Sequence, residues 1–159
     1  MNLNIPYMET DNKLLNDAYR IAAGDIVGNI VYYQNGLLTE EKPCMIAGLD
    51  YNTPWTRDTA INIWNALSIL SPEVSKNTLL AVLEEEEGNI YIGGQYWDSI
   101  IWMIGAREYC RFHKDDNFYR LAFEAGRNSV HRLEEDEFDE EDGLFRGPAV
   151  YGDGIAAYP

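Results

Sequence analysis

Hydrophobic residues recur at helical spacing from near the start of the chain. The first such stretch begins at a capping residue, Thr10 or Asp11, and ends near Gly36. Its apolar positions are Leu14, Leu15, Ala18, Ile21, Ala22, Ile26 and Ile30. Gly24 and Gly28 lie one turn apart within this pattern, and their spacing predicts close packing against a neighbouring helix.

Four further segments have the periodicity of helices. They cover residues 56–70, 71–83, 95–113 and 115–133. The segment 95–113 is apolar on nearly all sides, which predicts burial all round, whereas 115–133 is amphipathic. Residues 37–51 lack helical spacing and predict a long loop with room for a short strand.

The alternation of buried and amphipathic helices predicts an all-α fold. Inner helices that touch neighbours on every side and outer helices that face water would form a double ring. No internal repeat of fixed period is visible, which disfavours a solenoid of the tetratricopeptide kind. The length of 159 residues fits a single domain.

Composition and charge limit the kinds of ligand that the chain is expected to bind. The chain is 46% hydrophobic and carries a formal net charge of −15, which repels nucleic acid and anionic membranes but does not affect a neutral sugar. No signal peptide or membrane-spanning run is visible, so we expect a cytoplasmic protein. Cys44, Cys110, His113 and His131 do not occur at metal or redox spacing, and we expect no metal and no cofactor.

The first candidate for a functional site is residues 51–58, where a loop leads into the predicted helix over residues 56–70. One interpretation is structural: Thr56 caps the helix, Asp58 favours its dipole and Trp55 packs as a staple. In the other, Arg57 and Asp58 bind vicinal hydroxyls of a sugar above the apolar ring of Trp55. Capping does not require adjacent Arg and Asp residues, which favours the sugar clamp.

Two later segments also allow both a functional and a structural interpretation. Residues 93–98 combine two glycines with Gln95, Trp97 and Asp98, a composition usual for a saccharide subsite. Asp98 favouring a helix dipole and Trp97 in a core would be an equally ordinary explanation. Asp153 stands between two glycines, which indicates either a special backbone conformation that presents one carboxyl group or a simple turn.

Residues 55–60, Trp-Thr-Arg-Asp-Thr-Ala, closely resemble the Trp-Thr-Arg-Asp-Ser/Thr-Ala signature of glucoamylase-like glycoside hydrolases of the six-hairpin type. The resemblance implies an (α/α)6 barrel of six inner and six outer helices. It also implies that Arg57 and Asp58 hold the non-reducing terminal sugar and that Trp55 lines its pocket.

Residues 95–98 look like the next barrel loop of trehalase-like and glucosidase-like relatives. The resemblance implies that Gln95, Trp97 and Asp98 bind substrate. The segment around Asp153 is similar to the loop of those enzymes that carries the general acid. This chain has Tyr-Gly-Asp-Gly there instead of their usual Ser-Gly-x-Asp, so a substrate-binding role is the alternative for Asp153.

A closed six-hairpin ring has twelve helices, whereas about five long ones are predicted here. Inner helices without a following partner would leave apolar faces exposed. We therefore expect residues 1–159 to be a partial (α/α)6 domain, its N-terminal part. The resemblance places the catalytic base in a late loop, and no residue of this chain matches that position, so we expect further chain to supply the base and the rest of the barrel.

These features predict an inverting glycoside hydrolase that acts on the non-reducing end of an α-linked glucoside or related oligosaccharide. An alternative is an (α/α)6 sugar epimerase, which would need His113 or His131 in a barrel loop, whereas the pattern places both on polar helix faces. A second alternative is a non-catalytic helical interaction domain that binds a protein partner through its aromatic loops.

Overall fold

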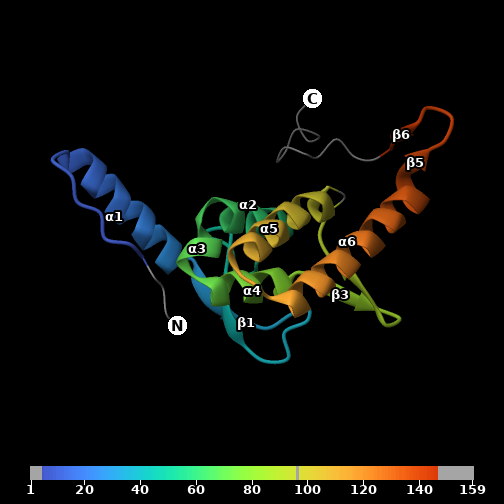
Figure 1. The fold of residues 1–159 in the computed structure, drawn as a ribbon, viewed down its shortest axis with the longest axis horizontal. Coiled ribbons are helices and arrows are strands. Elements are labelled where there is room, and N and C mark those ends of the chain that lie inside the picture. The colour runs from blue at the N-terminus through green and yellow to red at the C-terminus, as the bar shows by residue number, and fades with distance from the viewer. Residues whose placement is uncertain (1–4, 96, 147–159) are drawn as a thin grey trace.

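The structure is a computed structural model that describes residues 5–95 and 97–146 (Figure 1). The fold is mostly helical, as the hydrophobic periodicity predicts. Its helical elements are α1 (Lys13–Gly28), α2 (Thr56–Asn62), the π-helical η1 (Ile63–Leu67), α3 (Ser68–Leu70), α4 (Pro72–Ala81), α5 (Asp98–Phe112) and α6 (Asp116–Glu137).

Within the described ranges, three short antiparallel hairpins accompany the helices. They are β1 (Ile30–Tyr33) with β2 (Lys42–Met45), β3 (Leu83–Glu86) with β4 (Asn89–Ile92), and β5 (Phe138–Asp139) with β6 (Leu144–Phe145). Glu87 and Gly88 connect β3 to β4 with φ angles of 53° and 80°. Positive φ at both central residues is typical of the type I′ turn, whose twist suits a two-residue hairpin.

Local capping residues begin two helices where the sequence predicts them. The Ser71 hydroxyl accepts a backbone N–H from the first turn of α4, and Pro72 takes the first helical position. Asp115 caps α6 in the same way. The α1 helix begins slightly later than expected, because Asn12 is the residue whose side chain accepts its first N–H groups.

The first helix is shorter than its hydrophobic pattern predicts. It ends at Gly28, and residues 30–33 form β1 instead, because these β-branched and aromatic residues pair with residues 42–45. A Cβ atom placed on Gly24 or Gly28 would meet nothing within 4 Å. The close helical neighbour expected at these glycines is therefore not among the described residues.

The predicted helix over residues 56–70 is confirmed as the continuous run of α2, η1 and α3. This run packs against α5, and the two backbones lie close together where Gly105 faces Ala60: a Cβ on Gly105 would lie 2.7 Å from the Ala60 Cα. The main buried cluster lies around these helices, α4 and α6. Its members are Met45, Ile63, Leu67, Val74, Leu79, Val82, Leu83, Ile92, Trp102, Ala106, Tyr109, Phe118 and Ala125.

Several helices keep apolar side chains exposed. The α1 helix has no buried residue and extends away from the remaining helices in Figure 1. On α5, Ile100, Ile104 and Phe112 are exposed, so the prediction that this helix is buried all round is wrong for these residues. Ile61 and Trp64 are exposed on the neighbouring α2–η1 run. None of the described helices is long and apolar enough to cross a lipid bilayer.

The contact between α2 and α5 can be tested at Gly105. Gly105→Ala should lower the free energy of unfolding by about 1–3 kcal/mol, because the added methyl group would overlap the Ala60 backbone. Gly24→Ala is the matched control: it adds the same group to a helix where nothing lies within 4 Å, and it should leave stability unchanged or raise it by up to about 1 kcal/mol. Urea denaturation measures both, and a Gly105→Ala variant as stable as the wild type would contradict this packing.

Candidate functional site

The N-terminal ends of α2 and α5 bring two separate loops together. Trp55 occupies the N-cap position of α2 and makes no side-chain capping hydrogen bond. The prediction that Thr56 is the cap is wrong, because Thr56 is the first residue of the helix. Its buried hydroxyl donates a hydrogen bond to the Gly93 carbonyl oxygen at 2.7 Å, which ties residues 51–58 to residues 93–98.

Gly94 allows this close approach. Its φ angle is +111°, a conformation that favours glycine. A Cβ atom at this position would lie 2.7 Å from the Thr56 Oγ1 and 2.9 Å from the Asp98 Oδ2. Both the backbone angle and the available space therefore call for glycine at this point between the two loops.

Asp98 is the buried polar centre of the site. Only 2% of the residue is exposed, and its Oδ1 accepts a hydrogen bond from the Arg57 Nε at 3.1 Å across 41 residues of sequence. Its Oδ2 accepts the Gln95 backbone N–H at 2.8 Å. A buried carboxylate needs such partners, so Asp98 holds both the Arg57 guanidinium and the start of α5 in place.

A pocket of about 290 Å³ opens beside this ion pair. We call it the Arg57 pocket. Its lining consists of Tyr51, Trp55, Arg57, Asp58, Gln95 and Asp98. The rings of Tyr51 and Trp55 lie 6.2 Å apart in an edge-to-face arrangement. The pocket therefore combines two aromatic surfaces with a cation, carboxylates and a carboxamide.

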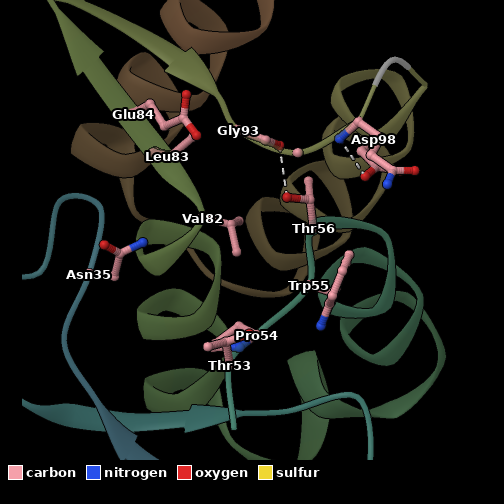
Figure 2. A pocket seen from close by; sticks show the side chains of 12 residues that line it. Asn35, Thr53, Pro54, Trp55, Thr56, Val82, Leu83, Glu84, Gly93 and Asp98 are labelled. Carbon is pink, nitrogen blue, oxygen red and sulfur yellow. Dashed lines mark hydrogen bonds between the residues drawn. The ribbon is translucent and has the colours of Figure 1, made fainter. Parts of the chain in front are cut away.

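A second pocket, of about 240 Å³, adjoins the first and is shown in Figure 2. We call it the hairpin pocket because Leu83 and Glu84 of β3 form part of its lining. It shares Trp55, Gln95 and Asp98 with the Arg57 pocket. The complete lining is Asn35, Thr53, Pro54, Trp55, Thr56, Val82, Leu83, Glu84, Gly93, Gly94, Gln95 and Asp98.

Most of the predicted site residues meet in the Arg57 pocket. The residues found there are Trp55, Arg57, Asp58, Gln95 and Asp98. Trp97 is partly buried at the N-cap of α5 and does not belong to this lining. Asp153 lies outside the described residues, so its predicted role as general acid stays a prediction.

Sequence reasoning missed several residues that line the pockets, among them Tyr51 and Glu84. Tyr51 belongs to the first candidate loop, and its contact with Trp55 was not anticipated. Glu84 begins an acidic run, residues 84–87, that interrupts the helical pattern without any distinctive spacing. Gly93, directly after β4, is the residue that could have indicated Glu84, because the absence of a Cβ atom there leaves room for the carboxyl group.

Other reactive side chains stand apart from the Arg57 pocket. His113 donates from its Nε2 to the Ser68 carbonyl oxygen at 2.6 Å, and His131 lies 3.1 Å from a Glu134 carboxylate oxygen. Burial raises the pKa of the Cys44 thiol to about 12, so this thiol stays protonated at neutral pH. Among the described residues there is no group of three or more His, Cys, Asp or Glu side chains suited to a metal ion.

Comparisons with known proteins found no relative of this chain. No family model, curated protein or solved structure matches it. The family and function implied by the resemblance of residues 55–60 to the glucoamylase-like signature therefore stay a prediction. The two pockets and the residues that line them are the remaining evidence on function.

Replacing Asp98 tests its structural role. Asp98→Ala should lower the free energy of unfolding by about 2–4 kcal/mol, because Arg57 would lose its carboxylate partner and the Gln95 N–H its acceptor. Asp50→Ala, at an exposed loop position, should change it by no more than about 0.5 kcal/mol. If denaturation gave both variants the same stability, the ion pair would not be holding the two loops together.

Proposed function

We propose that this chain forms part of the catalytic (α/α)6 toroid of an inverting glycoside hydrolase acting on the non-reducing end of an α-linked glucoside. The observation that carries the proposal is the meeting of Trp55, Arg57 and Asp58 with Gln95 and Asp98 around one pocket. The glucoamylase-like resemblance implies a sugar-binding role for all five residues, and the composition of residues 93–98 is by itself usual for a saccharide subsite. Their convergence supports a saccharide site over two unrelated helix starts.

The chemistry of the Arg57 pocket suits one sugar unit. Its volume lies near the lower end of the ~300–1,000 Å³ usual for ligand pockets, which favours a small ligand. Only the Nε–H of Arg57 is used in the ion pair with Asp98, so the terminal nitrogens can donate to sugar hydroxyls. The Asp58 carboxylate accepts hydroxyl hydrogens in this proposal, and Trp55 covers the apolar face of the ring.

Hydrolysis requires two more groups in the proposed enzyme. An inverting glycosidase needs a carboxylic acid to protonate the leaving oxygen and a carboxylate roughly 6.5–9.5 Å away to activate water. By resemblance Asp153 is the acid, and the base comes from a later loop of the barrel. Residues 51–58 and 93–98 would then bind and orient the terminal sugar without taking part in proton transfer.

The exposed apolar surface is compatible with the alternative hypothesis, a non-catalytic domain that binds a protein partner. Ile61 and Trp64 on the α2–η1 run, together with Ile100 and Ile104 on α5, are large apolar side chains between 38% and 55% exposed. A protein partner would cover them in that hypothesis, whereas further barrel helices cover them in ours. The epimerase hypothesis gains no such support, because neither His113 nor His131 lines the Arg57 pocket.

A measurement of sugar binding to this chain distinguishes the glycoside hydrolase from the protein-interaction domain. We expect glucose to bind with a dissociation constant on the order of 1 mM or weaker and to change the fluorescence of Trp55. Asp58→Asn should weaken binding at least about tenfold, because the amide replaces a charged acceptor, yet shift the melting temperature by no more than about 2 °C. Asp50→Asn is the control and should leave both values unchanged. A large loss of thermal stability with unchanged binding would make Asp58 a structural residue.

Asp153 is tested in a version of the protein that carries a complete barrel. Asp153→Asn should lower kcat by several orders of magnitude with little change in KM, because the variant cannot protonate the leaving oxygen. Substrates with activated leaving groups should suffer much less, since they need no proton. An equal loss on both kinds of substrate would assign Asp153 to binding instead.

A further inference from the structure

Glu84 holds a position that the other glutamates of its run do not share. It borders the hairpin pocket, whereas Glu86 forms an ion pair with Arg132 at 2.6 Å. A Cβ atom on Gly93 would lie 2.5 Å from the Glu84 Oε1, so the carboxyl group lies directly over that glycine. No ion pair with Glu84 occurs within the described parts of the chain, and its oxygens can accept hydrogen bonds from a ligand.

The backbone around this carboxyl group is well fixed. Gly93 donates its N–H to the Val82 carbonyl oxygen at 2.9 Å, which keeps β4 beside β3 under the carboxyl group. Asn35, elsewhere in the hairpin pocket, donates from its Nδ2 to the Ala81 carbonyl oxygen at 3.3 Å. The next residue, Gly36, has a φ angle of +59°, and a Cβ atom there would lie 2.5 Å from the Leu80 carbonyl oxygen. The hairpin pocket is therefore bounded by segments that are pinned to the end of α4.

The two pockets share three lining residues and therefore lie next to each other. They meet at Trp55, Gln95 and Asp98, and in Figure 2 Glu84 and Asn35 lie on the side of the hairpin pocket opposite Trp55 and Asp98. The hairpin pocket, about 240 Å³, is similar in volume to the Arg57 pocket, about 290 Å³. A sugar held by Arg57 and Asp58 would thus have its neighbour between Trp55 and Glu84.

We propose that Glu84 determines specificity by accepting hydrogen bonds from the hydroxyls of a second sugar unit in the hairpin pocket. The ligand class is then a neutral disaccharide or longer oligosaccharide, because an unpaired carboxylate in a chain of net charge −15 repels a uronic acid or phosphorylated sugar. This inference rests on the proposed sugar-binding function of the Arg57 pocket.

Titrations of the purified chain with glucose and with maltose test the inference. The wild type should bind maltose at least about tenfold more tightly than glucose, as expected for a charge-assisted hydrogen bond to the second unit. Glu84→Gln should reduce the affinity for maltose to about that for glucose and leave glucose binding within about twofold. Glu85→Gln is the matched control, since Glu85 lies next along the strand and borders neither pocket, and it should bind both sugars as the wild type does.

The outcomes separate this inference from the function on which it rests. Glucose binding that depends on Asp58, combined with equal affinities for glucose and maltose, would overturn the role of Glu84 and leave the sugar site standing. Equal effects of Glu84→Gln and Glu85→Gln on maltose binding would also overturn the role of Glu84 without contradicting the sugar site. If neither sugar bound to the wild-type chain, the proposed function would fail and this inference with it.

Discussion

The close approach of α5 to α2 is the constraint on which the candidate site depends. Gly105 lets the two helices come within contact of each other's backbone at Ala60. Because both helices begin at the same end of this interface, their preceding loops are brought side by side. The pockets are thus a consequence of helix packing. A larger residue at position 105 would therefore disturb the geometry of the site as well as the packing of the core.

Polar contacts convert this proximity into a defined geometry. The Asp98 carboxylate is almost fully buried and is satisfied by Arg57 and by the Gln95 N–H. Burying an ion pair costs desolvation free energy, so it is weak evidence for stability alone. Its value here is orientation, because a guanidinium fixed at Nε presents its remaining donors in one direction. In our proposal that direction is toward the hydroxyls of a terminal sugar.

Local signals in the sequence were enough to predict part of this structure. The start of α4 follows from the Ser71 cap and the start of α6 from the Asp115 cap, since both depend on a few neighbouring residues. The end of α1 could not be predicted this way, because β1 is stabilised by pairing with a strand further along the chain. For the same reason the Arg57–Asp98 contact and the position of Glu84 were missed: each depends on residues distant in sequence. Composition indicated which loops carry polar chemistry, and only packing showed that they share one site.

The most direct test of this account is a titration of the isotope-labelled chain with glucose, followed through its backbone amide resonances. We expect the amides of Arg57, Asp58 and Gln95 to shift together and to saturate with one dissociation constant, because residues from both loops line the same pocket. Shifts confined to one loop, or to the exposed apolar face around Trp64, would contradict a single sugar site formed where α2 and α5 begin.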